Sequence, residues 1–235
     1  SIPGRGEFIR LALEEGGADY VDVGRERGRG RGVQAIVKWL EDRKLDHPPF
    51  APPFLKAGRL VVGQTANILA YLGPRLGLVP KSEATRLWAQ QLQLTIADFV
   101  DEIHDVHHPI AASLYYHEQK KESRRRSAHL REERVPKFLG YFERVLAQNG
   151  SRHSFSIGRR VSYVDLSLFQ LVAGLTYAFP NTMAAAPRTW PRLHALHDRI
   201  AERPRIAAYL ASPRRLAFNE DGLFRHYPEL DVPRS

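Results

Sequence analysis

The sequence predicts a two-part fold in which an α/β segment is followed by an all-helical segment. Helix and strand signals alternate over residues 1–72, whereas every long segment from about residue 83 onward has helical periodicity. Between the two parts, Gly73-Pro74 and Pro80 mark a linker. A chain of 235 residues is long enough for two small domains. We therefore expect one domain at residues 1–73 and a second, all-α domain at 82–212.

The first part contains two predicted helices and a strand before its most regular segment. Apolar residues between Phe8 and Leu13 follow a turn and predict the first helix. Residues 20–23 (Tyr-Val-Asp-Val) predict a strand, and residues 33–40 predict a second helix. Together with the elements that follow, the order is β-α-β-α-β-β-α with its first strand missing.

A hairpin and a helix are predicted next, over residues 53–72. Pro53 opens a strand, where a missing N–H is tolerated, and Ala57-Gly58 supplies a turn. Residues 60–62 form a short apolar run of strand type. Thr65 is the expected N-cap of the helix that follows, and a helix N-terminus is suited to an anion. Apolar residues at helical spacing continue that helix: Ile68, Leu69 and Leu72.

The second part is predicted to consist of helices at 83–117, 127–149, 162–178, 190–202 and 204–212. Pro109 should kink or interrupt the first of them. The helix from Ser162 has capping-box spacing, with Asp165 in the place of the usual Glu or Gln. Because this helix is apolar nearly all round, we expect it to be buried at the centre. Residues 213–235 have no clear period and are expected to wrap the surface.

Composition excludes several classes of protein. The chain has no cysteine, so it holds neither a disulfide nor a cysteine nucleophile. No apolar run is long enough to span a bilayer, and no secretory signal pattern begins the sequence. We therefore expect a cytoplasmic protein without a membrane partner.

The net charge of +9 raises the question of nucleic-acid binding. The basic residues gather at 25–31 and at 124–126, and no aromatic residue is interleaved with either cluster. A base-stacking platform is therefore lacking. We favour a basic, soluble surface and expect no nucleic-acid partner.

The hairpin and helix carry a resemblance to a known family. The matching positions are Pro53, Leu55, Gly58, Leu60, Gln64, Thr65, Ile68, Tyr71 and Leu72. Their pattern resembles the thioredoxin-like half of a glutathione transferase, and the Ser162 capping box resembles that on the central helix of the same family. The resemblance covers both parts of the chain, from Ser1 to about Tyr209. It is strongest to sigma- and mu-like enzymes, with bacterial-type divergence.

The resemblance implies a glutathione site. In the family the proline corresponding to Pro53 is cis, and the residue before it, here Pro52, pairs with the cysteinyl part of glutathione. Because Pro52 has no N–H, one of the two family hydrogen bonds is lost, and we expect weaker affinity. Trp39 and Lys44 resemble the pair that holds the glycyl carboxylate. Gln64-Thr65 resembles the pair that holds the γ-glutamyl end.

The resemblance also implies a homodimer in which Asp98 reaches the partner's glutathione, with Asp101 as the rival for that role. The electrophile would be a small hydrophobic molecule, and its expected pocket residues are His107, Leu114, Tyr115 and Phe218. His104 and His108 lie at a spacing that would allow them to bind a metal from one helix face. Further ligands are not specified, so we expect glutathione as co-substrate and no metal.

Two alternatives stay open for the group that stabilises the glutathione thiolate. Matching the family's Gly-Arg pair to Gly4-Arg5 puts its tyrosine two positions before Ser1, outside the sequence. Alternatively Ser1 itself is the hydroxyl donor, because serine-type classes have a serine four residues before an arginine. We favour the tyrosine, because Trp39 and Lys44 resemble residues of sigma- and mu-like enzymes. Arg5 would then lie near the sulfur and favour its anion.

The resemblance therefore implies a glutathione transferase that conjugates the glutathione thiolate to a hydrophobic electrophile. A transferase-like fold kept as a non-catalytic binding or scaffolding module is one alternative, since fold does not fix function. A glutathione-dependent isomerase is another.

Overall fold

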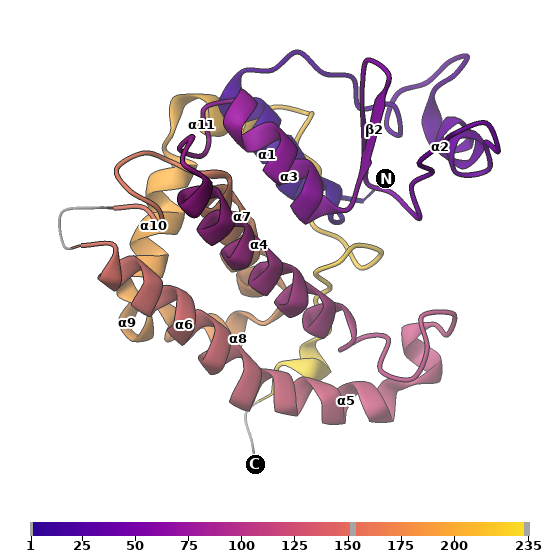
Figure 1. Cartoon of the computed structure of the whole chain (residues 1–235). Coiled ribbons are helices and arrows are strands. Elements are labelled where there is room, and N and C mark those ends of the chain that lie inside the picture. Colours follow the sequence, from indigo (N-terminus) through magenta and orange to yellow (C-terminus); the bar gives the residue numbers. More distant parts are fainter. Residues whose placement is uncertain (1, 151–153, 233–235) are drawn as a thin grey trace.

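A computed structural model describes residues 2–150 and 154–232. In Figure 1 the N-terminal part lies at the top, and the longer helices form layers below it. Its helices are α1 (Gly6–Gly16), α2 (Gly32–Leu40) and α3 (Thr65–Arg75). They agree with the three helices predicted for this part, although α3 runs two residues past Gly73, through the first proline of the predicted linker.

The described residues contain one sheet, formed by β1 (Phe54–Ala57) and β2 (Leu60–Gly63). The two strands are antiparallel, with Leu55 opposite Val62. Gly58 turns the chain with φ 61°, a conformation that favours glycine. The predicted hairpin is confirmed.

The predicted strand at residues 20–23 is not formed. A strand needs a neighbour for its backbone N–H and C=O groups, and among the described residues β1 pairs only with β2. Side chains fix this segment instead. The Tyr20 hydroxyl donates to Glu14 over 2.8 Å, and Arg10 donates to Asp22 over 2.6 Å.

The helical part begins with α4 (Glu83–His104), which is shorter than the predicted 83–117. The Ser82 side chain caps its N-terminus by accepting from the Thr85 N–H. The helix stops five residues before Pro109, whose ring disfavours a helical conformation in the residue before it. A short 3₁₀ turn, η1 (Tyr116–Glu118), follows.

The next helix is longer than the predicted 127–149 and contains an irregular turn. It consists of α5 (Lys120–His129), a π-helical turn (Leu130–Arg134) and α6 (Val135–Gln148). Pro136 stands in the first turn of α6 and donates no hydrogen bond to the preceding turn. We attribute the widened turn to that missing donor.

The central helix α7 (Tyr163–Ala178) is buried on nearly every side, as its apolar composition predicts. It contacts α1, α4 and α10, so it joins the two parts of the chain (Figure 1). Its capping box is formed: the Asp165 carboxylate accepts from the Ser162 N–H over 2.7 Å, and the Asp165 N–H donates to the Ser162 hydroxyl. The remaining helices are α8 (Pro180–Met183), α9 (Ala186–Thr189), α10 (Pro191–Ala201) and α11 (Pro204–Leu210).

The C-terminal segment does more than wrap the surface, so that expectation was wrong. Leu223, Phe224 and Leu230 are buried in the main core. Asp231 is also buried, and its carboxylate accepts from the Asn181 N–H over 2.6 Å, at the start of α8. A short turn, η3 (Pro228–Leu230), precedes it. Within residues 2–150 and 154–232, no helix has the length and apolarity needed to cross a membrane.

Candidate functional site

A cavity of about 1360 Å³ lies where the two parts of the chain meet. Its walls come from the start of α1, the segment after α1, α2, β1 with the residues before it, and the end of α3. The last turn of α4 and residues 221–225 of the tail close another side. The cavity is thus built from segments that are far apart in the sequence.

The charged residues around this cavity favour an anion. Six of its lining side chains are cationic and three are carboxylates. The cationic residues are Arg5, Arg10, Arg25, Lys56, Arg75 and Arg225. A net basic cavity attracts and retains a small anionic ligand.

Arg5 lies at the N-cap of α1 and lines the cavity. Its guanidinium is ion-paired with Asp101 on α4, which ties the first helix of the N-terminal part to the helical part. The cation is therefore partly neutralised by a carboxylate. The expected hydroxyl donor Ser1 lies outside the described residues.

Trp39 also lines the cavity, from the last turn of α2. Its ring lies 6.3 Å from the ring of Phe54 on β1, centroid to centroid. The Lys56 ammonium lies 5.8 Å from the Trp39 ring centroid. An aromatic ring and a cation therefore meet on this wall, where the ammonium is held close to the ring face.

Lys44 does not line the same cavity. It is exposed in the loop after α2, where its backbone N–H donates to Asp42 over 2.9 Å. It borders a separate, shallower depression next to α2. The structure therefore does not bring Lys44 and Trp39 to one cavity.

The Pro52–Pro53 peptide bond is cis, as the family resemblance implies. Both prolines line the cavity directly before β1. Pro52 is exposed and Pro53 is half-buried. The Pro52 carbonyl can accept a hydrogen bond, but no N–H accompanies it.

Gln64 and Thr65 lie at the start of α3, but in different roles from those predicted. Gln64 occupies the N-cap with φ 66°, and Thr65 is the first helical residue, so the expectation that Thr65 is the N-cap was wrong. The Thr65 hydroxyl oxygen is buried without a hydrogen-bond partner. Neither residue lines the large cavity.

Asp98 is exposed on α4, one turn before Asp101. It lies four residues after Leu94, so the two side chains share one helix face. That face points to solvent, because Leu94 is 50% exposed. Asp101 is engaged by Arg5, whereas the Asp98 side chain is exposed.

The four residues expected to line the electrophile pocket do not line this cavity. Tyr115 is 72% exposed and stacks on His117. Phe218 stacks on Tyr177 and packs against the core. Leu114 is half-buried, and its carbonyl accepts from Gln119 over 2.9 Å.

His107 is buried, with 3% of its surface exposed, and its Nε2 lies 3.0 Å from the Leu223 carbonyl oxygen. Burial lowers the pKa of His107 to about 3, so the ring is neutral at pH 7. His104, one turn earlier, lines the cavity instead. Burial also lowers the pKa of His104.

Most of the cavity residues were not predicted as site residues from the sequence, and His104 and Arg225 are two of them. His104 was considered only as a metal ligand, and Arg225 was missed because the tail has no period that would place it. The available sequence signal is the position of Arg225, directly after the apolar pair Leu223-Phe224.

The chain has an α/β part and an all-helical part. A cavity lined by more cationic than acidic side chains lies where the two parts meet, and these features define the class of protein. A family model described as "Glutathione S-transferase, C-terminal domain" matches residues 104–213. The glutathione S-transferase of Plasmodium falciparum (isolate 3D7) is 24% identical over 214 residues, which cover 89% of this chain and 91% of that protein. Glutathione S-transferase P of Homo sapiens is 28% identical over 214 residues, covering 90% and 89%.

Two solved structures share the fold at 19% identity. "Structure of NaGST-2" has a TM-score of 0.65 and covers 91% of this chain and 94% of its own. "Structure of prostaglandin synthase D of Nilaparvata lugens" has a TM-score of 0.68 and covers 92% and 96%. Together these comparisons support the glutathione transferase family for this chain and an enzyme of that class, as the sequence predicted. They agree with a thioredoxin-like part followed by a helical part.

Proposed function

We propose that this protein is a glutathione transferase that joins the glutathione thiolate to a small hydrophobic electrophile. The observation that carries the proposal is the cavity between the two parts of the chain, with a cis Pro52–Pro53 bond in its wall and an excess of cations around it. Glutathione carries two carboxylates and one ammonium, so its net charge suits such a cavity. The thiolate form is more negative still.

We assign the ends of glutathione as the sequence predicts. The glycyl carboxylate would meet Trp39, and Lys56 beside the Trp39 ring supports that end of the site. Lys44 borders a separate depression, so it would have to reach this carboxylate from the loop after α2. The Pro52 carbonyl would accept from the cysteinyl N–H. Gln64 and Thr65 would hold the γ-glutamyl end, and the unpartnered Thr65 hydroxyl supports a ligand there.

A thiol with a pKa near 8.5 is mostly protonated at pH 7, so the site must stabilise the thiolate. Arg5 supplies positive charge at the cavity, shared with Asp101. The hydroxyl donor would be Ser1 or a tyrosine, the two alternatives that the resemblance leaves open. The electrophile would lie toward the end of α4 and the tail. His107, Leu114, Tyr115 and Phe218 stay the proposed pocket residues, although none of them lines the cavity.

We propose a homodimer that forms through the exposed face of α4. Leu87 and Leu94 are 65% and 50% exposed and lie two helical turns apart on one face. Exposed apolar side chains on one face are typical of an interface. Asp98 shares this face and would reach the partner's site from there.

Three finer assignments belong to the same proposal. Trp39 and Lys44 favour a sigma- or mu-like enzyme with bacterial-type divergence. We place the domains at 1–73 and 82–212, with 213–235 as the tail. We place the protein in the cytoplasm.

The experiment that tests the proposal is a calorimetric titration of glutathione, followed by a conjugation assay with chlorodinitrobenzene. We expect saturable binding that is weakened at least tenfold in Trp39→Ala and in the double variant Gln64→Ala, Thr65→Ala. A matched control replaces an exposed threonine and glutamine elsewhere, Thr176 and Gln148, and should bind normally. Failure of the wild-type chain to bind millimolar glutathione would refute the proposal.

A non-catalytic binding module is the second candidate, since fold does not fix function. Binding without turnover would identify that module. Turnover that rearranges one substrate without consuming glutathione would identify an isomerase.

A further inference from the structure

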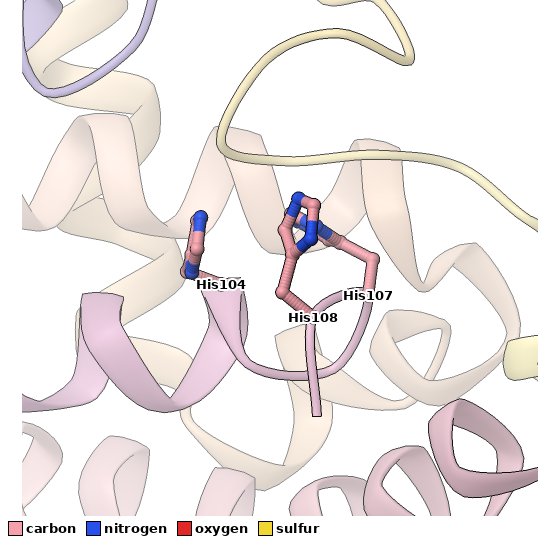
Figure 2. A group of neighbouring side chains, drawn as sticks. All are labelled: His104, His107 and His108. Carbon is pink, nitrogen blue, oxygen red and sulfur yellow. The ribbon is translucent and has the colours of Figure 1, made fainter. Parts of the chain in front are cut away.

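Three histidines gather at the end of α4. Figure 2 shows that His104 comes from the last turn of the helix and that His107 and His108 come from the loop just after it. One ring nitrogen of each lies within 4.8 Å of the others. The ring centroids of His104 and His108 are 4.9 Å apart, as are those of His107 and His108.

The hydrogen bonds of two rings fix which nitrogen carries the proton. The Nε2 of His107 lies 3.0 Å from the Leu223 carbonyl oxygen, and the Nδ1 of His108 lies 3.0 Å from the Leu114 carbonyl oxygen. A carbonyl oxygen only accepts, so each of these nitrogens donates an N–H. The lone pairs are therefore on Nδ1 of His107 and on Nε2 of His108.

The His107 Nδ1 is buried and has no hydrogen-bond partner in the structure. A buried acceptor without a partner is costly, and it calls for an explanation such as an unseen ion or water. Metal-binding histidines typically donate their second ring nitrogen to a backbone carbonyl, which fixes the ring and raises its basicity. His107 and His108 both have that arrangement.

We propose that His104, His107 and His108 form a binding site for a divalent transition-metal ion, with Zn²⁺ as the expected occupant. Imidazole nitrogens suit zinc, and three histidines with an open fourth position are a known zinc arrangement. The proposal does not rest on the proposed glutathione chemistry, although His104 lines the same cavity. It differs from the expectation of no metal because folding adds His107 to the two histidines that the sequence placed on one face.

The rings would have to close in around the ion. Two nitrogens that share a tetrahedral zinc at 2.0–2.1 Å are about 3.3 Å apart. The present separations reach 4.8 Å, so side-chain rotation must bring the nitrogens inward by about 1.5 Å. His104 and His108 are half-buried at the end of a helix, where such rotation is open to them.

The surroundings of the three histidines leave a position for a fourth ligand and balance part of the charge. His104 lines the large cavity, so a water molecule or a ligand atom in that cavity would complete the coordination. The nearby Arg5 is ion-paired with Asp101, and the Asp105 carboxylate lies 3.6 Å from the His104 Nδ1. The Asp101 and Asp105 carboxylates therefore offset part of the positive charge of Arg5 and of the bound ion.

The test is a calorimetric titration of the full chain, treated with a chelator and then dialysed, with Zn²⁺ alone. Co²⁺ then serves as the spectroscopic probe, because its visible absorption reports nitrogen coordination and geometry. We expect one ion per chain, and at least tenfold weaker binding in His104→Ala and in His108→Ala. Circular dichroism checks that both variants, which leave the buried His107 intact, keep their helices.

The control is His194→Ala on α10, where His194 and His197 have ring centroids 6.0 Å apart beside Asp198. This variant should bind Zn²⁺ as the wild type does. Absence of stoichiometric binding by the wild-type chain overturns the proposal. So does binding that survives in His104→Ala and His108→Ala, or that disappears in His194→Ala.

Discussion

The Tyr209 hydroxyl donates a hydrogen bond of 2.7 Å to the carboxylate of Glu7, a residue 202 positions earlier. Both residues are fully buried. Glu7 lies on α1 and Tyr209 on α11, so this bond ties the N-terminal part to the last α-helix of the described chain. Arg215 also pairs with the Glu7 carboxylate, and Arg10 does so over 3.1 Å.

Removing the hydroxyl in Tyr209→Phe should destabilise the protein by about 1.5–3 kcal/mol, the usual range for a hydrogen bond to a charged group. Glu7 would keep its two arginines, so the carboxylate would stay paired. Urea unfolding followed by circular dichroism measures the change. Tyr115→Phe, at a tyrosine that is 72% exposed, is the control and should have no measurable effect.

The buried capping box of α7 should contribute far more to the stability of the fold than the exposed N-cap of α4. The Asp165 carboxylate accepts from the backbone N–H groups of Ser162 and Ser156, each over 2.7 Å. Asp165→Ala would leave both donors buried without partners, at about 1–3 kcal/mol each. Ser82→Ala, at the exposed cap of α4, should cost about 1 kcal/mol. Equal effects in thermal unfolding would contradict this account.

Alkaline pH should destabilise the fold partly through Tyr163. Burial raises the pKa of Tyr163 from 10 to about 12. Between those values the folded state keeps a proton that the unfolded state releases, so stability is full below pH 10 and falls as the pH rises. The loss attributable to this group is at most about 3 kcal/mol at pH 12.

Tyr163→Phe should therefore flatten the dependence of the melting temperature on pH above 10. Other buried tyrosines, such as Tyr209, also have raised pKa values, so the dependence should become weaker without vanishing. The exposed Tyr115→Phe should leave the profile unchanged. A Tyr163→Phe profile identical to the wild type would show that the group does not titrate as argued.

Pro52→Ala should tighten glutathione binding by roughly threefold to tenfold, the value of one neutral hydrogen bond. The new N–H would pair with the cysteinyl carbonyl beside the cis bond. Titration calorimetry measures the affinity, and Pro48→Ala, an exposed proline in the same loop, controls for loop flexibility. If Pro52→Ala binds no better, glutathione does not use this backbone position.

Charge on the exposed face of α4 should split the proposed dimer. Leu94→Arg would place like charges opposite each other across a symmetric contact. Sedimentation should then report monomers, while Leu60→Arg, at another exposed leucine, should leave dimers intact. If the wild-type chain sediments as a monomer, the exposed face of α4 is not a dimer interface.

Local signals predicted most of the secondary structure. The hairpin follows from Gly58 and the apolar run after it, and α7 follows from its capping box and apolar composition. The end of α4 was placed too late because helical periodicity continues past the residue where the backbone leaves the helix. The irregular turn before α6 was also missed, since it depends on hydrogen-bond geometry around Pro136.

The sequence by itself determined the two-part architecture and the resemblance to glutathione transferases, and that resemblance implied the cis proline before β1. Both rest on neighbouring residues at fixed spacing. Only the tertiary structure decided which side chains share a cavity. It brought Trp39, Arg5 and Arg225 to one hollow and left Lys44 outside it. It also placed the ring of His107 beside two other imidazoles, with its Nε2 held by the Leu223 carbonyl. Such contacts depend on long-range packing, for which one sequence carries no local signal.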